Sequence, residues 1–577
     1  MYRVWAPAAR QLHIDTGGVQ TPLAPCEHGW WRLDRELPPG ADYALRIDGG
    51  QPLPDPASRW QPAGVNGPSR WIDPQHFVWR HADFTPPDWR DAIVYELHIG
   101  TFTPQGTFDS AIERLDHLTA LGVTHVELMP VAEWDGPRGW GYDGVDWYAP
   151  HHAYGGPEAL ARLVDACHGC GLAVLLDVVY NHLGPSGAYL PRFGPYFSDR
   201  HHTAWGAAAN YDGPGSDEVR EFVIQNALLW LRDYRFDGLR LDAVHAIVDT
   251  SARHILEELR DRVDELEQQT GRRFVLVAES DLNDPRIIQT REHGGYALDA
   301  HWADDVHHAL HAVLTGEHAG YYGDFGSFAQ LADAMRSPYT YAGGYSPFRD
   351  RRHGRAPDGL AGEKFVVALQ NHDQIGNRAQ GDRITSLVST DRARVGAALI
   401  LLSPYIPLLF QGEEWGASTP FEYFTSFPDR NLGEAVSRGR RNEFKEFGWT
   451  FDQVPDPQDP ATFERSKLRW EELDQPAHRD MLDWYQQLIR LRRAHPVLRD
   501  GERDAVQVAY DEAACWLRVE RGPVTIACNL GKATADVPTS AGQSTNVLAA
   551  SGHCQITADA VHLAPDSVII LGPALDH

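Results

Sequence analysis

The stretch GLRLDAVHAI, residues 238–247, decides the fold because it ends a short apolar run with a charged pair. Asp242 follows Arg240 by two residues, where the neighbouring residues are typical of a buried strand. Such a pair indicates either a structural ion pair or an aspartate that must stay ionised for chemistry. The rest of the chain distinguishes these two possibilities.

Short apolar strands alternate with amphipathic helices on both sides of this stretch, from about Asp91 onward. The eight predicted strands lie within residues 92–100, 123–131, 172–182, 236–244, 273–280, 296–302, 364–373 and 405–416. Eight strands separated by helices predict a closed (β/α)8 TIM barrel. An open doubly wound sheet would have a Gly-rich phosphate turn after its first strand, and HIGTFTPQG (98–106) is not one.

Two further domains flank the predicted barrel. Residues 1–85 contain short alternating runs broken by Gly and Pro, which predict an N-terminal β-sandwich. Residues 501–577 include VTIACNLG and SVIILGPAL and predict a C-terminal all-β domain. We therefore expect an α/β protein whose catalytic barrel occupies residues 86–500.

Composition excludes several classes of function. The net charge of −28 argues against nucleic-acid binding, which needs a basic surface. No apolar run is long enough to cross a bilayer, the N-terminus lacks a signal-peptide pattern, and cysteines are few. These features predict a cytoplasmic protein without a membrane partner.

No metal or cofactor is expected either. The lone C-x-x-C at Cys167–Cys170 lies in a predicted helix without a second pair or a histidine cluster, which favours buried thiols over a redox or zinc site. The chain contains no D-x-[DN]-x-[DN]-G calcium loop.

Charged and polar residues cluster at the ends of four predicted strands, where a β/α barrel has its active site. These residues are Asp177 and His182 on the third strand, Arg240, Asp242 and His245 on the fourth, Glu279 on the fifth, and Asn371, His372 and Asp373 on the seventh. One such carboxylate would be explained as a helix cap or loop ligand. Acidic groups at four strand ends, two of them accompanied by His or Arg, favour a catalytic site.

Clustered carboxylates bind metals or perform acid–base chemistry. The interspersed Arg and His would repel a divalent cation, so glycoside cleavage fits better; it needs one ionised and one protonated carboxyl group. Arg240 would favour the anion of Asp242, the expected nucleophile. Burial after the apolar strand FVLVAE would raise the pKa of Glu279, as a general acid requires. Asp373 would hold sugar hydroxyls or keep the acid protonated.

DVVYNH, GLRLDAVH, VAES and LQNHD, in this order, resemble the four short motifs of the α-amylase superfamily (glycoside hydrolase family 13). The resemblance implies that Asp242 is the nucleophile, Glu279 the acid/base and Asp373 the third carboxylate. It also implies retention of configuration, with carboxyl groups roughly 5–5.5 Å apart. Substrate contacts are expected from Tyr142, Asp177, His182, Arg240, His245 and His372.

Within the superfamily, the chain resembles the maltooligosyltrehalose trehalohydrolase family most closely. ELHIGTFTPQGTF, ELMPVAEWDGPRGWGYDGV, DDVHHALHAVLTGE and LQNHDQIGNR carry this resemblance, which runs over most of residues 91–430. It implies hydrolysis of maltooligosyl trehalose next to its terminal trehalose, which is released, downstream of a maltooligosyl trehalose synthase. The trehalose end would be bound by Asp304, Asp305, His307, His308, Asn371, His372 and Gln374. The two aspartates also fit a helix start, where the helix dipole favours acidic residues.

Two alternatives remain open. A glycogen branching or debranching enzyme of the same superfamily would share the three carboxylates and the N-terminal sandwich. A non-catalytic carbohydrate-binding or transporter-associated relative would have lost the carboxylates, whereas this chain keeps all three.

Overall fold

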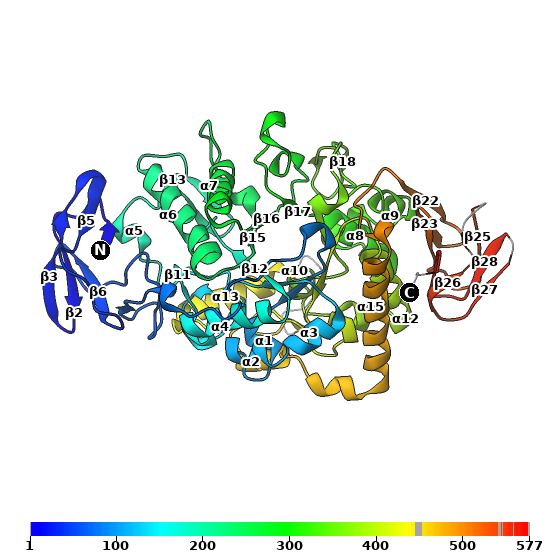
Figure 1. Ribbon diagram of the computed structural model, residues 1–577, viewed down its shortest axis with the longest axis horizontal. Helices are drawn as coiled ribbons and strands as arrows, with labels where there is room; N and C mark the ends of the chain where they lie inside the picture. The colour runs from blue at the N-terminus through cyan, green and yellow to red at the C-terminus, as the bar shows by residue number, and fades with distance from the viewer. Residues whose placement is uncertain (1, 445–452, 541–543, 545, 558, 575–577) are drawn as a thin grey trace.

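The computed structural model describes residues 2–574, except for residues 445–452, 541–543, 545 and 558. Figure 1 shows three parts in a row: an N-terminal β domain, a central barrel surrounded by helices, and a C-terminal β domain at the opposite end. The two small domains therefore lie on opposite sides of the barrel.

The centre of the molecule is a closed barrel of eight parallel strands, in the order β12-β15-β16-β17-β20-β21-β8-β9. The strands are β8 (Val94–Leu97), β9 (His125–Leu128), β12 (Ala173–Val178), β15 (Gly238–Leu241), β16 (Val275–Ala278), β17 (Ala300–Trp302), β20 (Phe365–Ala368) and β21 (Ile406–Phe410). Nearly every residue in them is buried, because side chains fill the barrel on one face and helices cover the other. The prediction of a (β/α)8 barrel is confirmed.

The strand register brings polar residues together inside the barrel. Asp177 of β12 pairs with Arg240 of β15, and Glu96 of β8 pairs with Glu127 of β9. Paired residues on parallel strands project to the same side, so these four side chains lie at adjacent positions around the wall.

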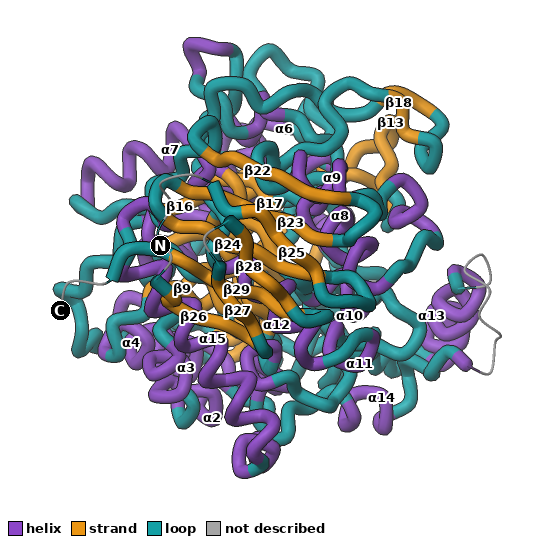
Figure 2. The backbone as a smooth tube through the Cα atoms, turned by 90° about the vertical axis from the view of Figure 1, so that its right-hand side faces the viewer, coloured by secondary structure: helices purple, strands orange, loops and turns teal. Residues whose placement is uncertain are grey.

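Helices surround the barrel, as Figure 2 shows from the side of the C-terminal domain. They include α2 (Phe108–Ile112), α3 (Leu115–Leu121), α4 (Gly156–Gly169), α6 (Ser216–Leu228), α7 (Ile255–Thr270), α8 (Asp304–Thr315), α12 (Thr390–Leu401) and α15 (Pro476–Ala494). Local sequence sets their ends: Thr107 forms a capping box before α2, and Gly122 ends α3 in the left-handed conformation at φ 96°. Cys167 is buried in α4, and the six cysteines are free.

The two terminal domains are each built from two antiparallel sheets. The N-terminal sheets have the orders β1-β5-β4 and β3-β2-β6-β7, from β1 (Arg3–Trp5) to β7 (Ser69–Arg70). The C-terminal sheets have the orders β22-β23-β24-β29-β26 and β25-β28-β27, from β22 (Val506–Asp511) to β29 (Ser567–Leu571). The predicted β domains at both ends of the chain are confirmed.

Several elements that the sequence pattern did not predict interrupt the alternation of strands and helices. They are the hairpin of β10 (Ala132–Glu133) and β11 (Asp146–Pro150), the hairpin of β13 (Phe197–Thr203) and β14 (Gly206–Ala209), the hairpin of β18 (Tyr345–Ser346) and β19 (Arg351–Arg352), the short helix α10 (His372–Gly376) and the helix α13 (Arg430–Glu443). The β18–β19 hairpin lies between α9 (Phe328–Ala334) and β20, and the other insertions follow the C-terminal ends of barrel strands. These other insertions contribute walls of the site described below.

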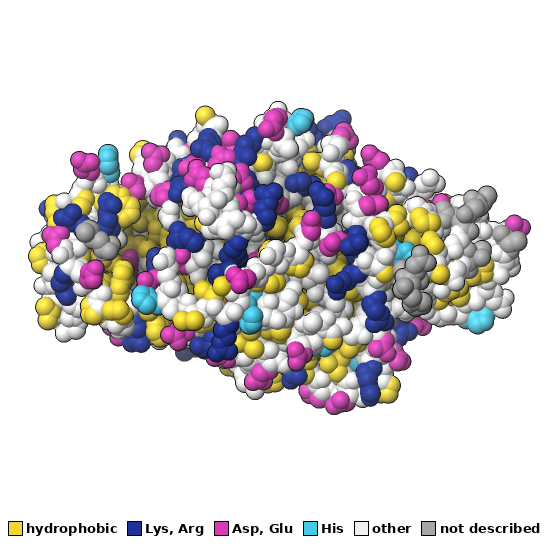
Figure 3. Space-filling view, viewed as in Figure 1, with side chains coloured by type: hydrophobic (Ala, Val, Ile, Leu, Met, Phe, Trp, Pro, Cys, Tyr) yellow, Lys and Arg dark blue, Asp and Glu magenta, His cyan; other side chains and the backbone are white. Residues whose placement is uncertain are grey.

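The surface carries both signs of charge. On the face in Figure 3, acidic and basic side chains are interspersed over the barrel, and acidic side chains gather over α7. In the part of the chain that the structure describes, no helix combines the length and apolar character needed to span a membrane.

Candidate active site

A cavity of about 670 Å³ opens at the C-terminal ends of the barrel strands. The carboxyl groups of Asp242, Glu279 and Asp373 all line it. Asp242 and Glu279 directly follow β15 and β16, and Asp373 lies in α10 after β20. Other residues around the cavity are Trp140, Tyr142, Asp143, His182, Trp205, Ala243, His245, Asp281, Asn377, Tyr423, Val436, Gly439, Arg440 and Glu443.

Asp242 is held by two donors. Its Oδ1 accepts a hydrogen bond of 2.7 Å from Nη1 of Arg240, and its Oδ2 accepts one of 3.0 Å from the side-chain amide of Asn181. The same Nη1 also lies 2.9 and 3.0 Å from the two carboxylate oxygens of Asp177. Charge-assisted bonds to both oxygens stabilise the Asp242 anion and fix its orientation.

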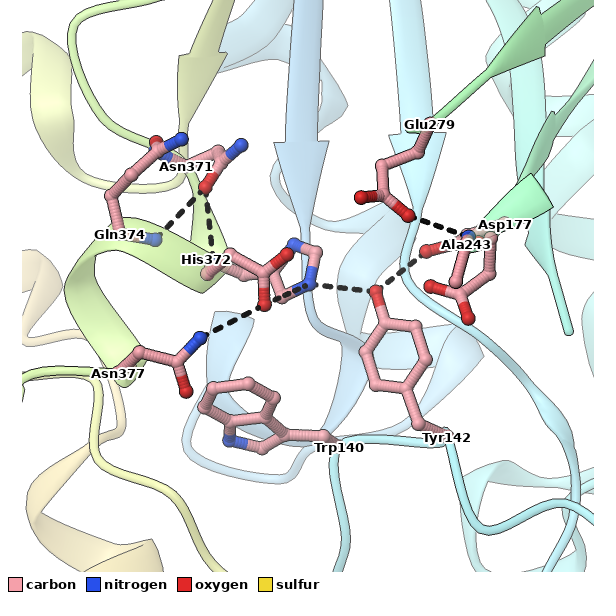
Figure 4. Close-up of polar contacts among 12 residues, drawn as sticks. Trp140, Tyr142, Asp177, Ala243, Glu279, Asn371, His372, Gln374 and Asn377 are labelled. Atoms are coloured by element: carbon pink, nitrogen blue, oxygen red, sulfur yellow. Dashed lines mark hydrogen bonds and ion pairs between the residues drawn. The ribbon is translucent and has the colours of Figure 1, made fainter. Parts of the chain in front are cut away.

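Glu279 has one close backbone donor and a more distant cation. Its Oε2 accepts a 2.5 Å hydrogen bond from the backbone N–H of Ala243 and lies 3.7 Å from Nη2 of Arg240 (Figure 4). Burial raises the pKa of Glu279, although Arg240 opposes this shift. A carboxyl group with a raised pKa keeps its proton at higher pH and can donate it, as a general acid does.

Ala243 joins these two carboxyl groups through its backbone. Its φ of 41° and ψ of 51° place it in the left-handed region, which costs a residue with a side chain about 1 kcal/mol. This conformation follows Asp242 directly and directs the Ala243 N–H at Glu279. The strain therefore lies between the two groups that face the same cavity.

Asp373 is positioned by the start of α10. The side-chain oxygen of Asn371 accepts the backbone N–H groups of Asp373 (3.0 Å) and Gln374 (3.1 Å), and the Gln374 side chain accepts the Asn371 N–H (2.8 Å). This capping box occupies side-chain groups of Asn371 and Gln374 that were predicted to contact sugar. In the structure these two side chains fix the helix that carries Asp373, and their contact with sugar stays a prediction.

A hydrogen-bonded chain runs behind the three carboxyl groups. Glu96 contacts Nδ1 of His372 at 2.5 Å. Nε2 of His372 lies 2.7 Å from the Tyr142 hydroxyl, which donates to Asp177 at 2.6 Å (Figure 4). Burial lowers the pKa of His372, but the charges of Glu96 and Asp373 overcome this and raise it to about 9. Burial raises the pKa of Asp177 to about 7 against the effect of Arg240. The charged imidazole thus donates from both ring nitrogens.

Flat aromatic faces border the cavity. The Tyr142 ring stacks on His372 with centroids 5.3 Å apart, and Trp205 stacks on His182 at 5.1 Å. Trp205 lies in the turn between β13 and β14 and is 53% exposed, which is high for a tryptophan. Exposed rings beside acidic groups suit the apolar faces and hydroxyl edges of sugars.

The four predicted trehalose-binding residues of α8 have different surroundings. Asp304 lies near Glu279 and Asp373, and burial together with these charges raises its pKa to about 8. Asp305 and His307 are 3% and 2% exposed; Asp305 accepts from Asn283 and from the Tyr341 backbone.

His307 and His308 complete this group. His307 bonds to the Leu369 carbonyl and the Tyr322 hydroxyl, and His308 packs against Tyr321. Neither lines the cavity. Protein partners occupy the side chains of Asp305 and His307, because α8 packs against β20. The contact of these residues with trehalose stays a prediction.

Several residues that shape the site were not predicted from the sequence. Glu96 and Glu127 are the penultimate residues of β8 and β9, so the strand-end rule applied to these two strands would have found both. Glu127 is 2% exposed and its Oε1 has no hydrogen-bond partner. Tyr423 and Arg440, which pack together with the guanidinium 4.9 Å from the ring centroid, carry no local signal.

One group of side chains has the composition of a metal site, but its hydrogen bonds argue against that use. Glu133, His151 and His152 present ligand atoms within 4.8 Å of one another. Nδ1 of His151 accepts the Ala153 N–H, so its Nε2 carries the proton and donates to the Gly136 carbonyl. His151 then has no free lone pair for a metal.

The arrangement suits retaining glycoside cleavage. One carboxylate is held as an anion, a second is desolvated, and both contact the same guanidinium at one cavity. A third carboxylate, Asp373, lines the same cavity and offers acceptors for sugar hydroxyls.

Comparisons with known proteins agree with this geometry. A family model described as "Alpha amylase, catalytic domain" matches residues 72–199, and one described as "Domain of unknown function (DUF3459)" matches residues 501–570. A malto-oligosyltrehalose trehalohydrolase from Arthrobacter ramosus is 49% identical over 576 residues, 99% of each chain.

A crystal structure from Salmonella typhimurium, described as an alpha amylase, superposes with a TM-score of 0.91 at 39% identity, covering 99% of this chain and 97% of that one. A 1,4-alpha-glucan branching enzyme from Bacillus caldolyticus is 30% identical over 52% of this chain and 50% of its own length. The likeness to the branching enzyme is thus partial, whereas the other two extend over essentially the whole chain.

Proposed function

The chain belongs to the malto-oligosyltrehalose trehalohydrolase family, and we propose from this premise that it hydrolyses maltooligosyl trehalose. It cleaves the α-1,4-glucosidic bond next to the terminal trehalose and releases trehalose and a maltooligosaccharide. The observation that carries the proposal is the convergence of Asp242 and Glu279 on one cavity, the first ion-paired and the second desolvated.

The first step breaks the glycosidic bond. Glu279 donates its proton to the bridging oxygen while the Asp242 carboxylate attacks the anomeric carbon from the opposite side. The C–O bond to trehalose breaks, trehalose leaves as the neutral alcohol, and the maltooligosaccharide is esterified to Asp242. Because its pKa is raised, Glu279 keeps to higher pH the proton that this step needs.

The second step restores the enzyme. Glu279, now a carboxylate, takes a proton from a water molecule, whose oxygen attacks the same anomeric carbon. The ester bond to Asp242 breaks and the maltooligosaccharide leaves with its original configuration. Two inversions at one carbon give net retention.

Other residues have supporting roles in this proposal. Asp373 binds hydroxyls of the sugar beside the cleaved bond, and the Tyr142 ring stacks on that sugar while His372 holds the Tyr142 hydroxyl from behind. Arg240 and Asp177 hold Asp242 in place. Asp304 contributes to the trehalose side, while His182 and His245 border the cavity.

The substrate class implies an upstream reaction and a compartment. An enzyme that converts the reducing end of a maltooligosaccharide into a trehalose unit has to act first. Six free cysteines support a reducing compartment, the cytoplasm.

The decisive experiment incubates the enzyme with maltotriosyl trehalose. The proposal expects free trehalose and maltotriose in equal amounts, with the maltotriose formed first as the α-anomer in a proton NMR time course. Release of β-anomer would remove the double-displacement mechanism. Activity on α-1,6 branch points without release of trehalose would favour the branching or debranching alternative, and binding without turnover would favour a non-catalytic protein.

A further inference from the structure

Asp373 is the least restrained of the three carboxyl groups that line the barrel cavity. Its side chain is 42% exposed, whereas the side chains of the other two are 12% and 13% exposed. Nε2 of His372 lies 3.5 Å from its Oδ1 but is already hydrogen-bonded to Tyr142. Among the described residues, the side chain that donates a hydrogen bond to this carboxylate is Asn377, whose Nδ2 lies 3.4 Å from Oδ1 (Figure 4). The orientation of Asp373 therefore depends on the orientation of the Asn377 amide.

The Asn377 amide lies between an acceptor and a donor. Asn377 follows the last residue of α10, and its Oδ1 accepts a hydrogen bond of 3.2 Å from Nη1 of Arg440. A guanidinium can only donate hydrogen bonds, and a carboxylate anion can only accept them. Turning the amide over would place its NH2 group against Arg440 and its oxygen against Asp373, so the hydrogen-bond network allows one orientation. Arg440 thus determines that the donor side of Asn377 faces the carboxylate.

Arg440 comes from the helix α13, 63 residues further along the chain than Asn377. Its guanidinium is itself held from several sides. Nη2 donates to the Gly376 carbonyl, Nη1 also donates to Glu443 at 3.2 Å, and the group lies over the Tyr423 ring, 4.9 Å from the centroid. A guanidinium that is stacked and hydrogen-bonded in this way has a fixed position and can fix the position of a neighbour.

The contact joins two insertions at the cavity wall. α10 follows the barrel strand β20, and α13 comes after the last barrel strand, β21. Asp373, Asn377 and Arg440 all line the cavity that holds the catalytic carboxyl groups. The late insertion α13 is therefore connected by hydrogen bonds to a carboxylate that an earlier insertion carries.

We infer that Arg440 is a positioning residue, which fixes the carboxylate of Asp373 through the amide of Asn377. The inference rests on the sugar-binding role proposed above for Asp373. Arg440 needs no contact with the sugar in this role. If Arg440 instead only attached α13 to α10, its bond to the Gly376 carbonyl would be enough and the Asn377 amide would not matter for catalysis.

A double-mutant cycle on the full chain tests this role. Arg440→Met and Asn377→Ala should each lower kcat/KM for trehalose release from maltotriosyl trehalose about tenfold. The loss should lie mainly in kcat, because hydrogen bonds to sugar hydroxyls strengthen in the transition state. The double variant should be no worse than the worse single variant, since both changes break the same connection. A fall of about a hundredfold in the double variant would show that the two residues act independently and would overturn the proposal.

Asn377→Asp provides a second test, which does not require the removal of Arg440. It keeps an acceptor for Arg440, and so the attachment of α13, but it replaces the donor to Asp373 by an acceptor. We expect kcat to fall at least as far as in Asn377→Ala, with an unchanged Tm. If Arg440→Met does not fold, this variant decides, and a normal kcat/KM contradicts the proposal.

Arg438→Met is the matched control, because Arg438 is exposed on the same helix and does not line the cavity. Its kcat/KM should equal that of the parent protein. The parent protein also separates this proposal from the proposed function: if it releases no trehalose, the proposed function fails. The same variants are then compared by their calorimetric affinity for maltotriosyl trehalose, and equal affinities, or no binding by any of them, overturn the positioning role as well.

Discussion

The two mouths of the barrel hold cavities of nearly equal volume, about 690 Å³ at the N-terminal ends of the strands and about 670 Å³ at the C-terminal ends. Both are lined by arginines and carboxylates. They differ in how completely the charges are paired.

At the N-terminal mouth, one arginine satisfies several acids in a closed network. Arg260 is 3% exposed and its guanidinium lies 2.7, 3.0 and 2.8 Å from carboxylate oxygens of Asp264, Glu267 and Asp299. Its Nε, Nη1 and Nη2 all have partners. Such a network holds the strand starts together.

At the C-terminal mouth, the arginine and the carboxylates are only partly paired. Arg240 binds Asp177 and Asp242 closely but stands 3.7 Å from Glu279, and its Nε and Nη2 have no hydrogen-bond partner. One acid is therefore held charged while its neighbour is left desolvated. Arginines and carboxylates thus support stability where they are closely paired, and chemistry where the pairing is incomplete.

The largest expected effect is on the acid at the C-terminal mouth. Glu279→Gln should reduce kcat for trehalose release about 10³- to 10⁴-fold, because the amide cannot donate the proton, while calorimetry shows substrate binding retained. Near-normal turnover of the variant would show that Glu279 is not the general acid. The proposed chemical role of the C-terminal mouth would then lose its main support.

The next effect is on stability at the opposite mouth. Arg260→Met should lower the free energy of unfolding by about 3 kcal/mol, since it leaves the partly buried Asp299 and Glu267 without this cation, and should leave kcat of the folded enzyme unchanged. Urea denaturation measures the free energy of unfolding, and the rate of trehalose release measures kcat.

A surface ion pair provides the control for Arg260→Met. Arg430 is 89% exposed on its side chain and pairs with Glu434. Arg430→Met should change stability by less than about 1 kcal/mol. If both variants were equally stable, the N-terminal network would have no structural role.

The pair of Glu96 and His372 gives a pH-dependent effect. Because the pKa of His372 is raised to about 9, its contribution to stability is complete below about pH 6.5 and is lost as pH rises through 9, up to about 3 kcal/mol. Glu96→Gln should remove most of this slope and move the loss of imidazolium to lower pH.

Urea denaturation between pH 6 and 10, with the alkaline limb of kcat/KM recorded in parallel, measures this effect. Glu96 contacts both Nδ1 and the backbone N–H of His372, so a changed pH slope in Glu96→Gln can be assigned to this pair. Identical slopes in variant and parent protein would show that Glu96 does not set the charge of His372.

The smallest expected effect tests how tightly α10 is held. A Cβ at Gly376 would lie 2.1 Å from the Trp140 ring, so Gly376→Ala must displace the helix that carries Asp373. We expect kcat/KM to fall about tenfold, or about 1.4 kcal/mol. Gly439→Ala is the matched control, because it lines the same cavity but has open space around its Cα, and its kcat/KM should stay unchanged.

Much of the site could be predicted because it follows local rules. Asp177 lies within the end of its strand, and Asp242 and Glu279 directly follow theirs, so strand periodicity and the order of β/α units place them at one mouth of the barrel. The raised pKa of Glu279 also follows from its apolar strand, and burial is its main cause in the structure. Glu96 and Glu127 also lie near the ends of barrel strands and could have been predicted in the same way.

Other assignments required neighbours that are remote in the chain. Asn371 and Gln374 have side chains suited to sugar, yet the structure uses them to cap α10. Asp305 and His307 follow a strand end, yet they face Asn283, Tyr341 and Tyr322. The sequence shows which donors and acceptors each residue has, but not which hydrogen-bond partners the fold places beside them.

The sequence by itself determined the barrel, the two β domains and the acids at the strand ends, because strand and helix periodicities are local and the parallel β/α order admits few topologies. Only the tertiary structure decided which acid is ion-paired, which is desolvated and which polar groups are already occupied. The physical reason is that pKa and hydrogen-bond satisfaction depend on distances of a few ångströms between residues from different strands, such as Arg240, Glu279 and Glu96 with His372.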